Sequence, residues 1–205
     1  TGTDNIAIGR LSLSASTDGA DNIAIGRSAL AVSGNDGDNN IAIGYKSGDA
    51  LTSGNKNVMM GLNAGRAITT AIRNTAVGAY ALQSAITTTA NGNTAFGYAA
   101  LGDLTGGVSN VALGYSCLSA LATGYRNIGI GYNVMDSANG AEHDNIAIGY
   151  DAMSAVDEGT AGGDADYNIA IGTDVTTNVI TTPITFLASA NSVIYAGGNP
   201  VFCEI

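Results

Sequence analysis

One short apolar phrase recurs ten times along the chain. Each copy begins with asparagine, and glycine follows four residues later, as in NIAIG at 22–26 and NTAFG at 93–97. The repeated asparagines are Asn5, Asn22, Asn40, Asn57, Asn74, Asn93, Asn110, Asn127, Asn145 and Asn168, and the glycines are Gly9, Gly26, Gly44, Gly61, Gly78, Gly97, Gly114, Gly131, Gly149 and Gly172. Successive asparagines lie 17, 18, 17, 17, 19, 17, 17, 18 and 23 residues apart. This period is too short for paired helices or propeller blades and is typical of single coils of a β-solenoid.

The three residues between asparagine and glycine predict a short strand that is apolar on both faces. The first and third, such as Ile6 and Ile8, are apolar or Thr and share one face, because side chains alternate along a strand. The residue between them is usually alanine, at Ala7, Ala24, Ala42, Ala76, Ala95, Ala112, Ala147 and Ala170. A sheet that is apolar on both faces is normally covered on both. The coil interior covers one face, and we expect the small alanines to form a subunit interface with a second copy of the chain on the other.

The repeated asparagine and glycine each allow more than one interpretation. Stacked asparagines can form amide ladders from coil to coil, or asparagine can recur because it tolerates a turn conformation. The glycine is expected where a side chain would clash or where φ must be positive.

The residues after the glycine predict the return leg of each coil. Tyrosine follows the glycine directly in five repeats, as Tyr45, Tyr98, Tyr115, Tyr132 and Tyr150. These rings are expected to form a column, which either offers a ligand surface for sugars or proteins or packs ring on ring along the rod. Leu30 and Met135 typify the apolar residue further on, which lies in a second strand or in a single helical turn.

Together these features predict an all-β fold, a parallel β-solenoid or β-roll of about ten coils of 17–18 residues. We assign residues 1–174 to the repeat solenoid. Residues 175–205 are expected to form a C-terminal cap or a transition segment, because Pro183 in a Thr-rich stretch favours an edge or a change of direction. The opening residues already belong to the first repeat, so we expect the chain to be part of a longer one.

Composition excludes several classes of partner. Seven Lys and Arg against seventeen Asp and Glu give a net charge of −10. Nucleic-acid binding requires clustered cations, and an acidic chain is also disfavoured at anionic membranes. No apolar run approaches the ~18 residues of a membrane span, so membrane insertion is not expected.

Few residues point to chemistry. We expect Cys117 to be a small buried filler, and Cys203 to be a free thiol or to form an intermolecular bridge. The lone His143 has no second ligand to suggest a transition-metal site. Structural calcium is left open by three acidic pairs, although solvated turns are the simpler interpretation. The pairs are Asp36 and Asp38, Asp157 and Glu158, and Asp164 and Asp166. No catalytic residue, no metal site and no cofactor are therefore predicted.

The pattern of asparagine, a β-branched or apolar residue, alanine, an apolar residue, glycine, tyrosine, and then alanine and leucine runs through residues 5–176. It resembles the head repeats of trimeric autotransporter adhesins. It is also similar, through GNTAFGYAAL and SNVALGYSCL, to repeats in bacteriophage tail fibres. The resemblance implies a parallel β-roll bundled as a homotrimer, and it implies no catalytic residue.

We therefore expect a non-enzymatic structural and adhesive fibre segment of a phage tail fibre, which gives reach and host-surface attachment. Its location would be extracellular, on a virion fibre or a bacterial cell surface. Its partners would be itself, as a homotrimer, and a host or cell-surface receptor of glycan or protein, bound through the variable turns. The first alternative is the head of a bacterial trimeric adhesin that binds matrix or cells. A minor alternative is a glycan-cleaving tailspike, which needs a carboxylate pair in a groove.

Overall fold

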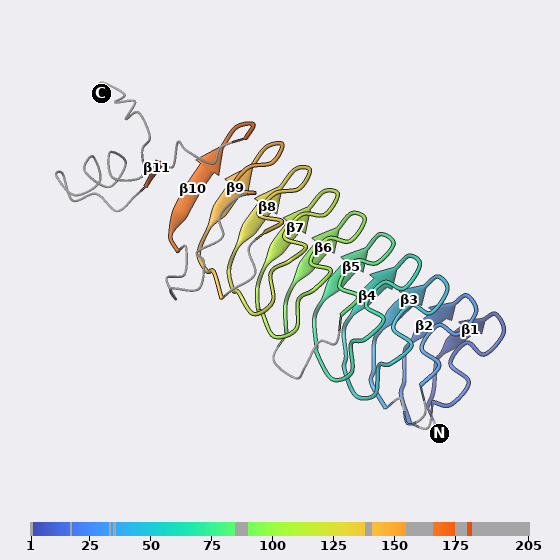
Figure 1. The fold of residues 1–205 in the computed structure, drawn as a ribbon. Coiled ribbons are helices and arrows are strands. Elements are labelled where there is room, and N and C mark those ends of the chain that lie inside the picture. The colour runs from blue at the N-terminus through green and yellow to red at the C-terminus, as the bar shows by residue number, and fades with distance from the viewer. Residues whose placement is uncertain are drawn as a thin grey trace.

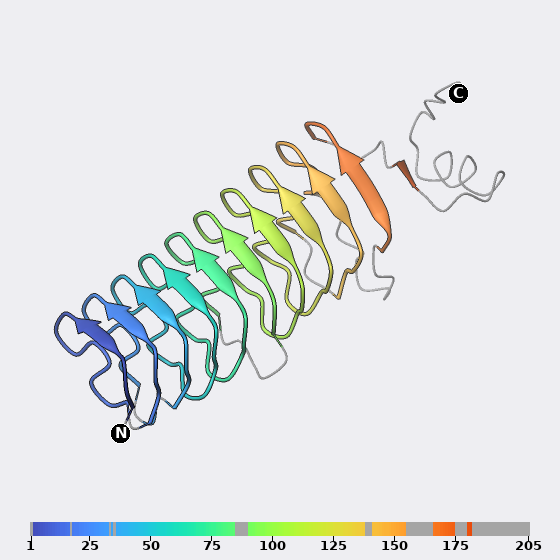
Figure 2. The ribbon, with the colours of Figure 1, turned by 180° about the vertical axis from the view of Figure 1, so that it is seen from behind.

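In the computed structural model, the repeats stack as the rungs of one rod (Figures 1 and 2). The structure describes residues 2–16, 18–32, 34, 36–84, 90–137, 141–154 and 166–174, together with the backbone of 180–181. The strands are β1 (Ile6–Ile8), β2 (Ile23–Ile25), β3 (Ile41–Ile43), β4 (Val58–Met60), β5 (Thr75–Val77), β6 (Thr94–Phe96), β7 (Val111–Leu113), β8 (Ile128–Ile130), β9 (Ile146–Ile148), β10 (Asn168–Ile171) and β11 (Ile180–Thr181).

All eleven strands belong to one sheet whose order follows the chain. Strands β1 to β10 pair in parallel, and β11 pairs antiparallel with β10. Equivalent residues of successive repeats stand opposite one another, so that Ala7 pairs with Ala24 and Ala24 with Ala42. The prediction of an all-β parallel solenoid is confirmed, and the described residues include no helix. Accordingly, no helix in the described part of the chain could span a membrane.

The return leg is neither a second strand nor a helical turn where the structure describes it. It is a run of turns in which the sixth and eighth residues after the asparagine take left-handed backbone angles, as at Ser116 and Leu118 with φ of 48° and 53°. These turns are held to the neighbouring coils by backbone hydrogen bonds, such as Leu118 N–H to the Val134 carbonyl at 2.8 Å. Such bonds offset the cost of left-handed non-glycine residues, which is of order 1–3 kcal/mol each.

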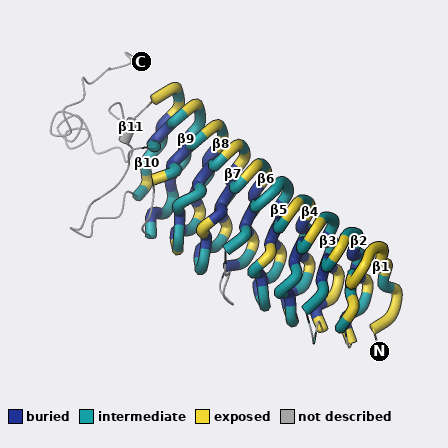
Figure 3. Tube along the Cα trace, turned by 45° about the vertical axis from the view of Figure 1, so that its right-hand side comes forward, coloured by how far each residue is buried: buried dark blue, intermediate teal, exposed yellow. Residues whose placement is uncertain are grey.

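The core lies inside the coils, between the strands and the return leg. It is built from the middle residue of each strand and from leucine or methionine of the return leg, for example Ala95, Leu101 and Leu118, none of which is exposed. Figure 3 shows buried and exposed positions recurring at equivalent places in successive coils. The interior is therefore continuous along the rod.

Two coils show how tightly this interior is filled. Met59 takes the middle position normally held by alanine, and glycine replaces leucine nearby in the return legs, at Gly48 and Gly65. A Cβ at either glycine would stand 2.7 Å from Met59 side-chain atoms. At the eighth strand the small residue is in the strand and the larger one in the return leg. A Cβ at Gly129 would stand 2.6 Å from the Sγ of Cys117. Because protein interiors are close-packed, larger residues at one position require smaller ones at the facing position.

Candidate functional site

The alanines lie in the coil interior, so the prediction that they form a subunit interface is wrong. The buried alanines are Ala24, Ala42, Ala76, Ala95, Ala112, Ala147 and Ala170, each without exposed surface, whereas Ala7 of the first strand is exposed. The space between strand and return leg accepts only a small side chain, which is why alanine recurs there. A residue enclosed by its own chain cannot contact a neighbouring chain.

The first and third residues of β1 to β9, together with Ile169 and Ile171 of β10, form the opposite surface, here called the outer face. Several of these large apolar residues are exposed, including Ile8 at 58%, Phe96 at 56% and Ile171 at 65%. The outer face runs the full length of the parallel sheet.

The ten asparagines form a hydrogen-bonded ladder beside the strands. In each step between described coils, the side-chain oxygen of one asparagine accepts the backbone N–H of the next, as from Asn127 to Asn110 at 3.0 Å. Its side-chain amide donates to a carbonyl of the next coil, as from Asn110 to Gly124 at 2.8 Å. Asn22 to Asn145 are fully buried, while Asn5 and Asn168 at the two ends are half-buried.

The left-handed turn beside the ladder belongs to the residue before each asparagine. Asp21, Arg73 and Arg126, for example, have φ of 57°, 59° and 58°, and no repeated asparagine has a positive φ. The interpretation that asparagine recurs to occupy the turn is therefore not supported. The residues in this turn differ from coil to coil, so the sequence offered no signal for it.

The repeated glycines satisfy both requirements expected of them. Gly9, Gly26, Gly44, Gly61, Gly78, Gly97, Gly114, Gly131, Gly149 and Gly172 have φ between 126° and 142°. A Cβ at Gly26 would stand 2.6 Å from the carbonyl oxygen of Gly44 in the next coil. The glycine column thus lets adjacent backbones approach where each strand ends.

The tyrosines pack on one another along the rod. Tyr98, Tyr115, Tyr132 and Tyr150 stack in sequence, with centroids 5.0, 5.1 and 5.2 Å apart and ring planes within 10°. Tyr45 stands apart from this stack, and the Arg27 guanidinium lies 4.3 Å from its ring centroid. Because stacked rings cover one another's faces, only their edges remain for a ligand. This geometry favours the packing interpretation over a sugar-stacking surface.

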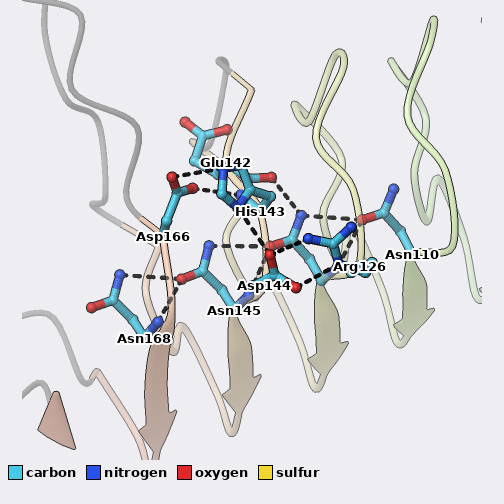
Figure 4. A network of polar contacts seen from close by, with 9 residues as sticks. Asn110, Arg126, Glu142, His143, Asp144, Asn145, Asp166 and Asn168 are labelled. Carbon is cyan, nitrogen blue, oxygen red and sulfur yellow. Dashed lines mark hydrogen bonds and ion pairs between the residues drawn. The ribbon is translucent and has the colours of Figure 1, made fainter. Parts of the chain in front are cut away.

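A polar network surrounds His143 in the turns before β9 and β10 (Figure 4). The Nδ1 atom of His143 lies 3.0 Å from Asp144 Oδ2, and its Nε2 lies 2.8 Å from Asp166 Oδ2. Arg126 pairs with both oxygens of Asp144, with its Nε at 2.6 Å from Oδ1. The His143 ring also stacks on Tyr125, with centroids 4.4 Å apart.

This network ties three successive coils together. The hydrogen bond from the Arg126 guanidinium has the largest effect on Asp144 and lowers the pKa of this carboxyl below its usual 3.8. The hydrogen bond from His143 acts in the same direction. Only the imidazolium form of His143 carries an N–H on both ring nitrogens and can donate to both carboxylates. Sequence analysis named His143 but did not pair it with Asp166 or Tyr125, which lie in the equivalent turns of the neighbouring coils.

The remaining candidate residues show no metal chemistry among the described residues. Burial raises the pKa of the Cys117 thiol to about 12, in agreement with a buried filler. No group of three or more His, Cys, Asp or Glu is placed to hold a metal ion in the described part of the chain. Asp38 accepts a hydrogen bond from the Ala20 backbone at 2.8 Å. Cys203 and the acidic residues at 157, 158 and 164, for which predictions were made, lie outside the described residues.

One family model matches the chain. The DegT/DnrJ/EryC1/StrS aminotransferase family matches residues 147–205, less than half of the 205 residues. Neither the comparison with curated proteins nor that with solved structures found a match. The matched segment contains most of β9 and all of β10 and β11, and its described residues are 147–154, 166–174 and the backbone of 180–181.

This match corrects four predictions. Resemblance to tail-fibre and adhesin repeats is not supported, because the family that matches is one of aminotransferases. The non-enzymatic, adhesive fibre function and the prediction that the chain is no enzyme are wrong for the same reason. The absence of a cofactor is also corrected, since aminotransferases use pyridoxal phosphate. The homotrimer, the receptor and the extracellular location stay predictions.

The residues of the matched segment do not by themselves fit pyridoxal phosphate. That cofactor is held through a Schiff base to lysine, and residues 147–205 contain neither Lys nor Arg. The two lysines of the chain are Lys46 and Lys56. Lys46 Nζ lies 3.8 Å from Asp49 Oδ2 in a turn of the third repeat, and Lys56 is exposed. The matched segment therefore supplies no lysine for the Schiff base that would hold this cofactor.

Proposed function

We propose that the solenoid is a self-association module. Copies of the chain pack through the outer face and so bring together the segments 147–205 that match part of the aminotransferase family model. The observation that carries this proposal is an outer face in register along ten parallel strands, six of which expose large apolar side chains, such as Phe96 and Ile130 at 56% and 37%.

The outer face is as large as the largest apolar patch of a typical monomer. Nine steps of about 4.8 Å make it about 43 Å long, and strands of three residues at about 3.3 Å make it about 10 Å wide. The product is roughly 430 Å², within the ~300–600 Å² of such patches, which are often functional. Burial of this area would remove the unfavourable contact of Ile, Val, Leu and Phe side chains with water.

Light scattering during size-exclusion chromatography of the full chain tests the proposal. We expect the wild type to elute as an oligomer, and Ile130→Lys on the outer face to dissociate it because the interface would bury an unpaired ammonium. Thr123→Lys adds the same charge to an exposed turn and serves as the control. A wild-type monomer at micromolar concentration, or equal dissociation by the two variants, would overturn the proposal.

The family match favours a second candidate function, transamination. We propose to test it with an amino donor, a keto-acid acceptor and added pyridoxal phosphate, followed by borohydride reduction and peptide mapping. Amino-group transfer with a reduced adduct on Lys46 or Lys56 would support this function and identify the attachment residue. Absence of both transfer and adduct in the folded full chain would show that this chain alone does not carry the activity.

A further inference from the structure

The order of residue types along the outer face is almost the same from either end of the rod. The first residues of β1 to β9 and the matching second residue of β10 are Ile6, Ile23, Ile41, Val58, Thr75, Thr94, Val111, Ile128, Ile146 and Ile169, a palindrome without exception. The third residues and their β10 equivalent are Ile8, Ile25, Ile43, Met60, Val77, Phe96, Leu113, Ile130, Ile148 and Ile171. This second series is also the same in either direction, with two exceptions. Met60 stands at the position that mirrors Leu113, and the small Val77 at the position that mirrors the large Phe96.

A palindrome in these columns matters for one arrangement of two copies. A two-fold axis that lies in the contact plane along the strand direction reverses the rod and places each column opposite itself. The first coil of one copy then faces the tenth coil of the other, and the fifth faces the sixth. Such an interface is isologous, because each residue meets its reversed equivalent twice. Val77 facing Phe96 also pairs a small side chain with a large one.

Charge along the chain favours the same reversed arrangement. Among the described residues, those of 2–73 carry six Lys and Arg against six Asp and Glu, whereas those of 74–174 carry Arg126 alone against seven. Copies that run in the same direction would place the two acidic halves side by side. Reversed copies place each acidic half beside a balanced half, which reduces the repulsion between them.

The edge of the outer face that follows each strand shows this complementarity in particular residues. Arg10 and Arg27 are exposed after β1 and β2, and Tyr150, Asp151 and Asp174 lie after β9 and β10. In the reversed pair, Arg27 stands opposite Tyr150, where a guanidinium can contact the edge of the tyrosine stack and the carboxylate of Asp151. In a same-direction pair the two-fold axis would run along the rod, and Arg27 would face the edge that precedes the strands of the other copy.

We infer that two copies of this chain associate face to face as an antiparallel, two-fold symmetric dimer through the outer face. This inference rests on the proposed self-association and replaces the threefold bundle expected from sequence. The pair buries roughly 860 Å² in total, in the size range of weak, transient interfaces. Sheets that pack in this way stand about 10 Å apart.

Spin-label distances in the full chain test the direction of the two copies. Cys117→Ala, which restores the commonest residue of that repeat position, and Cys203→Ser give a background without cysteine. A label at Thr3→Cys near the first coil and another at Ser109→Cys in the seventh are then compared in separate samples. In the antiparallel dimer the two Thr3 labels lie about 43 Å apart along the rod and the Ser109 labels about 14 Å, apart from the label arms. Equal separations at both sites would overturn the antiparallel arrangement.

A charge-swap series provides an independent test. Ile25 of the second coil is inferred to face Ile148 of the ninth coil in the other copy. We expect Ile25→Lys to weaken the dimer by about tenfold or more, and the double variant Ile25→Lys with Ile148→Glu to recover most of that affinity. The control double variant, Ile25→Lys with Leu113→Glu, should show no recovery. Residues 25 and 148 lie seven coils apart in one chain, about 34 Å, so recovery must act between copies.

The outcomes separate this inference from the proposed function. A monomeric wild type overturns both. A trimer, or a dimer with equal label separations and no charge-swap recovery, leaves self-association intact and overturns the antiparallel arrangement. A dimer with unequal separations and recovery by Ile148→Glu supports both.

Discussion

Asn110 receives two hydrogen bonds from Asn127, the asparagine of the next coil. Its side-chain oxygen accepts the Asn127 backbone N–H at 3.0 Å and the Asn127 side-chain amide at 3.1 Å. The Asn110 amide in turn donates to the carbonyl of Gly124 at 2.8 Å. One buried side chain therefore joins two coils through three hydrogen bonds, and repetition of this relation extends it along the rod.

Asn110→Ala should destabilise the fold strongly. Its removal leaves buried donors on Asn127 and the carbonyl of Gly124 without their partner, at about 1–3 kcal/mol for each unsatisfied group. We expect a loss of about 3–5 kcal/mol in the free energy of unfolding, measured by urea titration. Asn168→Ala at the half-buried end of the ladder is the matched control and should cost clearly less. Equal losses would show that the ladder does not act through burial.

Gly26→Ala should be tolerated far less well than Gly34→Ala. Both glycines have positive φ, of 129° and 77°. The added Cβ at Gly26 would meet the backbone carbonyl of Gly44 at 2.6 Å, whereas no atom lies within 4 Å of one at Gly34. Gly34→Ala should lower the free energy of unfolding by about 1–2 kcal/mol from backbone strain, and Gly26→Ala by more. Thermal melts of the two variants decide the comparison.

The stability of the fold should depend strongly on side-chain size at Ala112 in β7 and only weakly at the neighbouring Leu113. Ala112 is fully buried in the coil, so Ala112→Leu should overpack the core and cost at least about 1–3 kcal/mol of stability. Leu113 is 36% exposed on the outer face, so Leu113→Ala should change unfolding little at dilutions where the chain is monomeric. Circular dichroism melts and light scattering measure the two effects. A mild Ala112→Leu variant would contradict the placement of alanine inside the coil.

The ion pair between Arg126 and Asp144 should make stability depend on acid pH. Because Arg126 lowers the pKa of Asp144 in the folded state below 3.8, the pair stabilises the fold above pH 3.8 and loses this contribution as pH falls through the folded pKa. The difference in urea midpoint between wild type and Arg126→Met should therefore be largest near neutral pH and shrink in acid. Arg73→Met provides the control at the equivalent repeat position, where the described residues show no carboxylate contact. A difference that stays constant with pH would contradict the assignment.

Much of the fold could be predicted from sequence because the signals repeat. The asparagine and glycine positions predict parallel stacking in register, since equivalent residues of a solenoid lie beside one another. The candidate network around His143 could not be predicted in the same way. Its partners, Arg126 and Asp166, are separated along the chain and meet only because consecutive coils place their turns side by side. The function could not be predicted either, because the family match falls on residues 147–205, where the repeat pattern ends.

The sequence alone determined the period, the strand positions and the fact that both faces of the strands are apolar. Only the tertiary structure decided which face is inside, because both faces are apolar and hydropathy alone would bury the larger isoleucine in place of alanine. Volume makes that distinction. The return leg lies so close behind the sheet that alanine fits, and Met59 fits only where Gly48 and Gly65 make room. The larger apolar residues therefore lie on the outside of the sheet, where they form the surface through which a second copy is proposed to pack.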